Sequence, residues 1–168
     1  MYPLTLPLAS NPPGADPVAV LFAAIKAAYP SLPFTQANAK IAELKAWPAK
    51  YKWNRTYLRL QATDDPKQYA EFYYDRTDVT LKVINPLFTD AEAKALASKT
   101  GVEVLAAIAA KVKLNLTKAD FWVEDYTFTS TGGTATPNFR LEARYDSIFW
   151  YGRMNVWLHG DTRNIQPT

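Results

Sequence analysis

An amphipathic helix, a threonine-containing turn and a set of strands occur twice in this chain in the same order, and this recurrence restricts its fold more than any other feature. The matching segments are residues 21–28 with 105–112, 34–38 with 116–120, and 72–76 with 142–146. Units of this size bury their apolar faces against each other, so we expect one fused core rather than two independent domains. The alternative is that any two helix-plus-hairpin units share such a pattern.

Local signals mark the helices. Asp16-Pro17 supplies an N-cap and a proline for the first helical position, and apolar residues recur at helical spacing until Tyr29-Pro30. The run Thr89 to Glu92 has the pattern of a capping box, which predicts a helix start there. Lys99-Thr100-Gly101 predicts the end of that helix, because glycine adopts positive φ. Residues 104–112 predict a further amphipathic helix.

Period-two alternation of aromatic and β-branched residues predicts the strands. The predicted strands are Arg55 to Ala62, Gln68 to Tyr74, Phe121 to Thr129, Phe139 to Tyr145 and Ile148 to Leu158. Residues Lys40 to Trp47 fit a helix as well as a strand, and we assign a strand. The turns at 64–67 and 130–134 connect neighbouring strands, so we expect mostly antiparallel pairing.

These elements predict an α+β fold in which two similar helix-plus-antiparallel-strand units, a degenerate internal duplication, form one compact domain with an extended N-terminal arm. We expect the arm at residues 1–15, the first unit at 16–86 and the second at 87–168.

The arm is rich in proline, with Pro3, Pro7 and the pair Pro12-Pro13, which excludes helix and central strand. Four apolar residues alternate along one side of it, namely Tyr2, Leu4, Leu6 and Leu8. Such residues anchor an extended segment to another protein's groove or sheet edge. We expect the arm to dock on a neighbouring subunit instead of folding back on its own domain. A terminus without any role is the alternative.

Composition removes much catalytic chemistry. The chain has no cysteine and one histidine, which excludes disulfides, thiolate zinc sites and multi-histidine metal sites within one chain. His159 is a candidate general base, but no nucleophile accompanies it. Asp64-Asp65 precedes a proline and is typical of a turn, and Glu124 and Asp125 would point to opposite faces of a strand. We therefore predict no enzymatic activity, no catalytic residues, no cofactor and no metal.

The charge and hydropathy patterns favour a chain outside the membrane. The chain has 19 Lys and Arg residues and 16 Asp and Glu residues, and this modest excess of positive charge weakly favours anionic partners. No apolar run approaches the roughly 20 residues that span a bilayer, and the first residues contain no basic leader. We expect a non-secreted chain with no membrane partner.

Cations and aromatic rings alternate from Lys50 to Arg59. In a strand, one face of this stripe would carry Tyr51, Trp53, Arg55, Tyr57 and Arg59. Single-stranded nucleic acid is bound by this combination, but an ordinary half-solvated sheet and a protein interface have the same composition. Residues 149–157 concentrate further aromatic residues, of which we take Trp150 and Trp157 as candidate interface residues.

Two short motifs carry a resemblance to a known group of proteins. Tyr73-Tyr74-Asp75-Arg76-Thr77-Asp78-Val79 resembles the "YNRxDL" strand ending of small virion structural protein domains of large tailed bacteriophages. Leu114-Asn115-Leu116-Thr117-Lys118-Ala119-Asp120 resembles the "LNLTxxD" step after the helix of the same domains. Asp75 stands where asparagine is usual, and the second copy at Tyr145-Asp146-Ser147 lacks the arginine.

The resemblance implies a location in the virus particle, after synthesis in the cytoplasm of the host bacterium, and it transfers no catalytic residue. We therefore expect a non-enzymatic structural or assembly component of the virion, in the capsid decoration, the neck, or the tail and fibre apparatus. Its expected partners are other virion proteins or copies of itself. The alternative is a phage-encoded nucleic-acid-binding protein that uses the stripe from Lys50 to Arg59.

Overall fold

A computed structural model of the chain describes residues 1–6, 14–46, 55–85, 87–96, 99–123 and 138–158. It is a mixed α+β structure, which confirms the predicted fold class. The elements are β1 (Tyr2–Pro3), α1 (Pro17–Ala28), β2 (Ala39–Ala46), β3 (Arg55–Ala62), β4 (Tyr69–Asp75), β5 (Thr77–Asp78), the 3₁₀ turn η2 (Val79–Leu81), α2 (Asp90–Leu96), α3 (Gly101–Val112), β6 (Phe121–Trp122), β7 (Asn138–Ala143), β8 (Trp150–Tyr151) and β9 (Arg153–Trp157).

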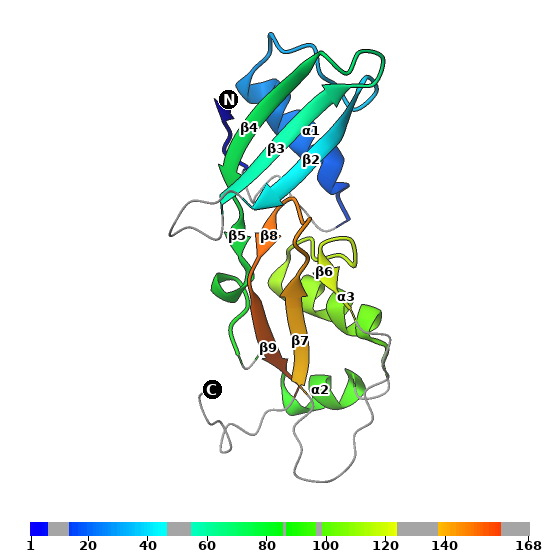
Figure 1. Cartoon of the computed structure of the whole chain (residues 1–168). Helices are drawn as coiled ribbons and strands as arrows, with labels where there is room; N and C mark the ends of the chain where they lie inside the picture. Colours follow the sequence, from blue (N-terminus) through cyan, green and yellow to red (C-terminus); the bar gives the residue numbers. More distant parts are fainter. Residues whose placement is uncertain (7–13, 47–54, 86, 97–98, 124–137, 159–168) are drawn as a thin grey trace.

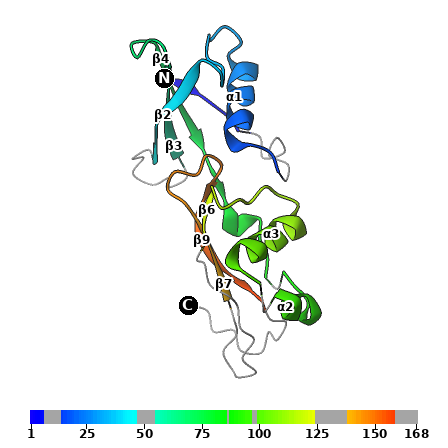
Figure 2. The ribbon, with the colours of Figure 1, turned by 90° about the vertical axis from the view of Figure 1, so that its right-hand side faces the viewer.

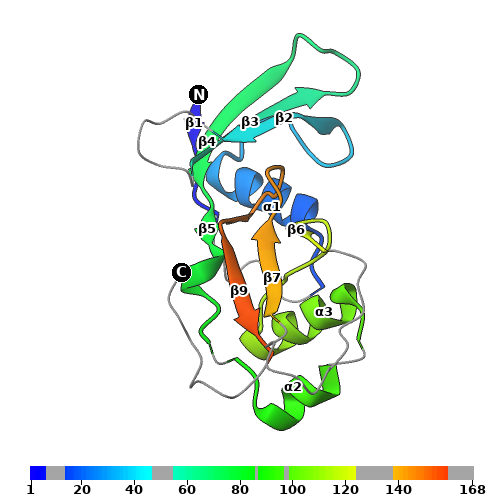
Figure 3. The same ribbon diagram turned by 60° about the horizontal axis from the view of Figure 1, so that its bottom comes forward.

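The molecule consists of two units stacked end to end, so it is elongated rather than compact (Figure 1). The first unit holds α1 and strands β1 to β4, and the second holds the remaining elements. In both units the helices lie on one side and the sheet on the other (Figure 2). Helix α2 lies at the end of the second unit that is remote from the first (Figures 1 and 3).

The first sheet has the strand order β1-β4-β3-β2. Strands β2, β3 and β4 are antiparallel, as predicted, and β1 joins β4 in parallel. Alternation along β3 buries Thr56, Leu58, Leu60 and Ala62 on one face. Helix α1 covers this face with its own buried residues, and it begins where predicted because the Asp16 carboxylate accepts a hydrogen bond from the Val18 backbone N–H.

The second unit contains a three-stranded sheet, β6-β7-β9, which we call the second sheet, and a two-stranded sheet, β5-β8. Strands β6, β7 and β9 are antiparallel, and β5 joins β8 in parallel. Only Gly152 separates β8 from β9 along the chain, and its φ of +91° belongs to the region that favours glycine. A Cβ at this position would lie 2.7 Å from Asp78 Oδ1. The glycine therefore permits both the bend between the strands and the close approach of the β5 segment.

The capping signals locate the helices of the second unit, with one correction. Thr89 and Glu92 exchange the hydrogen bonds of a capping box at the start of α2, as predicted. Gly101 does not end this helix, since α2 already ends at Leu96. Thr100 and Glu103 form a second capping box, so Gly101 is the first residue of α3. The prediction of a helix end at Gly101 is wrong because Thr100, directly before it, is the N-cap of the next helix and pairs with Glu103.

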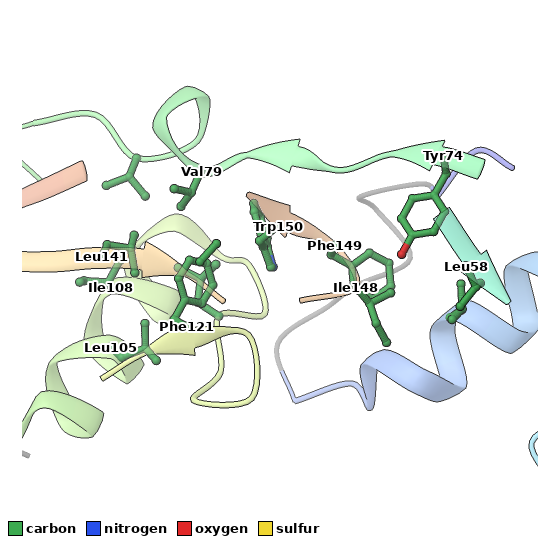
Figure 4. Close-up of a cluster of buried hydrophobic side chains, with 14 of the residues drawn as sticks. Leu58, Tyr74, Val79, Leu105, Ile108, Phe121, Leu141, Ile148, Phe149 and Trp150 are labelled. Atoms are coloured by element: carbon green, nitrogen blue, oxygen red, sulfur yellow. The ribbon is translucent and has the colours of Figure 1, made fainter. Parts of the chain in front are cut away.

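One hydrophobic cluster contains buried residues of both units. Ile148, Phe149 and Trp150 lie between the side chains of the second unit, such as Phe121, and those of the first, such as Tyr74 (Figure 4). Burial of residues from both units in one cluster opposes their separation, because separation would expose apolar surface to water.

Polar contacts hold the same junction. Asn115 of the second unit accepts a hydrogen bond from the Gly14 backbone N–H and donates one to the Ala15 carbonyl, at 3.1 and 2.6 Å. The buried guanidinium of Arg76, which follows β4, donates to the carbonyls of Tyr145 and Ser147 at 3.1 and 3.3 Å. The two units are therefore joined through backbone groups as well as through the core.

The first residues of the arm fold back on their own unit, so our expectation that the arm avoids its own domain is wrong for residues 2–4. Strand β1 pairs with Phe72 and Tyr73 of β4, and the Leu4 backbone N–H donates to the Tyr73 carbonyl at 2.9 Å. Leu4 itself is buried. The alternating apolar residues do anchor an extended segment to a sheet edge, as their pattern indicates, but the edge belongs to the same chain.

Candidate functional site

The candidate site is the face of the first sheet opposite α1, which we call the open face of the first sheet. Directly paired residues of neighbouring antiparallel strands share a face. The register places Lys45, Tyr57 and Tyr73 in one row and Glu43, Arg59 and Glu71 in the next. Arg55 with Asp75, and Lys40 with Gln61 and Tyr69, form the outer rows. This face contains the described part of the predicted basic-aromatic stripe.

Cations lie over aromatic rings across this face. The guanidinium carbon of Arg59 is 4.0 Å from the centroid of the Tyr69 ring, and that of Arg55 is 5.6 Å from the Tyr73 ring. The Lys45 Nζ atom is 4.9 Å from the Tyr57 ring. Each such contact contributes about 0.5–1 kcal/mol at an exposed site and more where water is excluded. The stacking holds long, flexible side chains in fixed positions before any partner binds.

Carboxylates fill the positions between the cations. The Tyr57 hydroxyl donates to Glu71 Oε1 at 2.7 Å, and Arg55 Nε lies 3.1 Å from Asp75 Oδ1. Burial, helped by the Glu71 hydrogen bond, raises the pKa of Tyr57 to about 12, so its hydroxyl stays a donor at neutral pH. The rows of this face bring together four cations and three carboxylates. The described part of the face is therefore close to neutral.

Such a face is suited to binding protein rather than to acid-base chemistry. Tyrosine and arginine are enriched at the centres of protein interfaces, where charged residues without partners are depleted. A nucleic-acid backbone instead requires an excess of cations, since each contacted phosphate carries a charge. The interleaved carboxylates thus favour a protein partner. The Arg59 Nε atom is buried and has no hydrogen-bond partner within the described residues.

The structure places seven of the predicted interface residues, and the remaining four side chains lie outside the described residues. Arg55 and Arg59 are half-buried on the open face of the first sheet, and Tyr57 is there too but is only 8% exposed. Leu4 and Trp150 are buried in the chain's own core, so their prediction as partner contacts is wrong. Tyr2 is at the exposed edge, and Leu6 packs against the core. The side chains of Leu8, Tyr51, Trp53 and Trp157 lie outside the described residues, as do Glu124, Asp125, His159 and the turn at 130–134.

The sequence analysis did not identify the side chains of β4 that contact Arg55, Tyr57 and Arg59. Tyr69, Glu71 and Tyr73 supply the rings and the carboxylate beneath the cations of β3. The signal was present, because the turn at 64–67 fixes the pairing of β3 with β4 and thereby places the alternate residues of both strands on one face.

A second polar cluster is buried between the sheet and the turn of the second unit. The Ser147 hydroxyl donates to Asp120 Oδ1 at 2.7 Å and accepts a hydrogen bond from the Trp150 backbone N–H. Thr117 donates to the other carboxylate oxygen at 3.1 Å. Ser147 is buried, so this pair fixes the turn and does not offer a nucleophile to a substrate. Burial raises the pKa of Asp120, against these hydrogen bonds, which lower it.

Replacing Asp120 with asparagine should make stability less dependent on pH. A carboxyl whose pKa is raised in the folded state makes folding less favourable at neutral pH, and this cost disappears as the pH falls through the folded-state pKa. Asp120→Asn should therefore raise both the free energy of unfolding and the Tm at pH 7. The difference from the wild type should shrink towards pH 3. Thermal unfolding at a series of pH values measures both.

Asp146→Asn is the control with the opposite sign. Hydrogen bonds from Arg144 lower the pKa of Asp146, so its charge stabilises the fold at neutral pH and this contribution is lost as the pH falls through the folded-state pKa. This variant should lose stability at pH 7 and match the wild type in acid. An Asp120→Asn variant that loses stability at pH 7 as Asp146→Asn does would contradict the assignment.

The described residues contain neither a metal-binding cluster nor a membrane-spanning helix. No group of three or more His, Cys, Asp or Glu side chains is arranged to hold a metal ion. None of the helices in the described ranges has the length and apolar character needed to cross a bilayer.

Comparison with known proteins gave one match. The model of a family described as "Family of unknown function (DUF7941)" matches residues 16–166. No curated protein and no solved structure matches the chain.

Proposed function

The chain belongs to this family of unknown function, and we propose that it is a non-enzymatic structural or assembly component of a tailed-phage virion that acts through protein–protein contacts. The observation that carries the proposal is the open face of the first sheet. There Arg55 and Arg59 are stacked on tyrosine rings and accompanied by carboxylates, which is the composition of a protein interface.

The virion is proposed on the resemblance of residues 73–79 and 114–120 to small virion structural domains. In the fold, the first motif ends β4 and continues through β5, and the second follows α3 and forms the turn before β6. Both motifs contribute to the junction of the two units through Arg76 and Asn115. The two motifs therefore help to fix the relative position of the two units.

We also propose that the two units arose by duplication. The first unit has a short strand, a helix and then three antiparallel strands, and the second has a short strand, two α-helices and then three antiparallel strands, β6, β7 and β9. In each unit the short strand pairs in parallel with a later strand, β1 with β4 and β5 with β8. The turns after α1 and α3 support this further. In the first, the N–H groups of Asn38 and Ala39 donate to the Thr35 carbonyl, and in the second, those of Asp120 and Phe121 donate to the Thr117 carbonyl.

Particles and variants test the proposed function. Mass spectrometry of purified phage particles should find the chain at a structural copy number, and absence from the particles would overturn the proposal.

The double variant Arg59→Ala/Tyr69→Ala should fold but lose incorporation, because it removes the closest cation–ring pair of the open face. Interface residues of this kind cost about 2 kcal/mol or more when truncated, so we expect a decrease of about 30-fold in affinity for particles that lack the protein. Tyr145→Ala is the control, because Tyr145 is a highly exposed tyrosine of the second unit. Incorporation of the double variant at the wild-type level would exclude this face, and salt-sensitive binding of a single-stranded oligonucleotide instead would favour the nucleic-acid alternative.

A further inference from the structure

The open face of the second sheet contains a polar hollow of about 530 Å³ that is lined by Arg140, Arg153, Met154 and Asn155. The register pairs Arg140 with Asn155 and Glu142 with Arg153, so these four polar side chains share one face of β7 and β9. Phe139, Leu141 and Val156 alternate with them and are buried in the core. The hollow therefore lies on the side of the sheet away from the core.

Not every cation around this hollow has a carboxylate partner among the described residues. Arg140 is paired with Glu142 at 2.7 Å. Arg144, on the same sheet, is paired with Asp146 and lies 4.3 Å from the centroid of the exposed Trp122 ring. Arg153 is exposed and has no ion pair or hydrogen-bonded carboxylate among the described residues. On the first sheet, by contrast, Arg55 has a carboxylate partner and Arg59 a tyrosine ring.

We propose that this hollow binds a side-chain carboxylate of an acidic segment of a partner protein, with Arg153 as the principal ligand and Asn155 as a hydrogen-bonding neighbour. The planar guanidinium matches a carboxylate with two parallel hydrogen bonds, and a charge-assisted pair of this kind is among the stronger polar contacts. The hollow is larger than one carboxylate, so it also accommodates the neighbouring groups of an extended peptide.

Glu142 distinguishes an acidic protein from nucleic acid. Its carboxylate lies on the same face and neutralises Arg140, which leaves one uncompensated cation facing the hollow. A single carboxylate balances this charge, whereas a chain of phosphates would bring further negative charge close to Glu142. This inference rests on the proposed function, because it names the chemistry of a protein partner at a second place on the molecule.

Titration of the full-length, ¹⁵N-labelled protein tests the inference at low salt. The probes are hexaglutamate, hexaglutamine, inorganic phosphate and a short oligothymidylate. Hexaglutamate should shift the Arg153 Nε–H and Asn155 side-chain amide signals, and Arg153→Gln should weaken its binding about tenfold or more. Lys67→Gln, at an exposed cation in the turn between β3 and β4, is the control and should leave the binding unchanged. Hexaglutamine should not bind, and the oligothymidylate and phosphate should bind more weakly than hexaglutamate.

The inference is overturned if hexaglutamate shifts neither signal, if Lys67→Gln weakens binding as much as Arg153→Gln, or if phosphate or the oligothymidylate binds more tightly than the peptide. These results are independent of the particle analysis. A chain found in particles that fails to bind hexaglutamate disproves only the carboxylate site. A chain that binds hexaglutamate through Arg153 but is absent from particles disproves only the proposed function.

Discussion

Replacing Trp150 with alanine should lower the free energy of unfolding by about 3–5 kcal/mol, the range for removal of a large buried aromatic side chain. Trp150 is 0% exposed, and its ring centroid lies 6.1 Å from that of Phe121. Its indole N–H donates to the Asn115 carbonyl at 3.2 Å, so truncation also leaves a buried acceptor without its partner. Denaturant unfolding followed by far-ultraviolet circular dichroism measures the loss.

Trp122→Ala is the matched control, because Trp122 is 48% exposed on β6 of the same unit. Surface substitutions away from caps and networks usually change stability by about 0.5 kcal/mol or less, and loss of the Arg144 stacking adds about as much again. A Trp150→Ala variant that loses no more than Trp122→Ala would show that the junction of the two units does not depend on this side chain.

The sequence predicted local elements well because their signals are local. Strand β3 has the predicted bounds, and α1 begins after the predicted N-cap. The hydroxyl and carboxylate pairs that start helices act within four residues, so they can be recognised without knowing the fold. The error at Gly101 also arose locally, since two capping signals overlap between α2 and α3.

The parallel pairings could not be predicted in the same way. Strands β1 and β5 are two residues long, and each joins a strand that follows much later in the sequence. No alternating pattern can be recognised in two residues, and pairing over such a separation depends on which sheet edge remains open after the unit has formed. The end-to-end stacking of the units has the same origin, because contacts such as that of Asn115 with Ala15 link distant segments.

The candidate site could be predicted from its cations but not from its partners. Alternation along β3 placed Arg55, Tyr57 and Arg59 on one face, and the structure agrees. The alternation does not show whether each side chain is exposed to solvent or buried by the rest of the chain. Trp150 illustrates the limit, since aromatic residues are enriched both in interfaces and in cores and composition alone does not distinguish the two.

Leu4→Ala should destabilise the isolated protein by about 2–4 kcal/mol, because this residue of the arm is buried against its own unit. Leu4 is 5% exposed, and it follows the two residues of β1 at the edge of the first sheet. The Tyr2 ring packs at 5.0 Å from Tyr29 and 5.6 Å from Phe72, and the Tyr29 hydroxyl donates to the Pro3 carbonyl. Thermal and denaturant unfolding of the variant measure the loss.

Leu81→Ala supplies the comparison, because Leu81 is 74% exposed in η2 and its truncation should change stability by about 0.5 kcal/mol or less. Leucine is replaced by alanine in both variants, so the difference between them isolates burial at the sheet edge from the change of residue type. The pairing of β1 with β4 also occupies backbone groups that an exposed edge would present to another chain. If Leu4→Ala proved as mild as Leu81→Ala, residues 2–4 would contribute little to the fold and would be free to leave this edge for a neighbouring subunit.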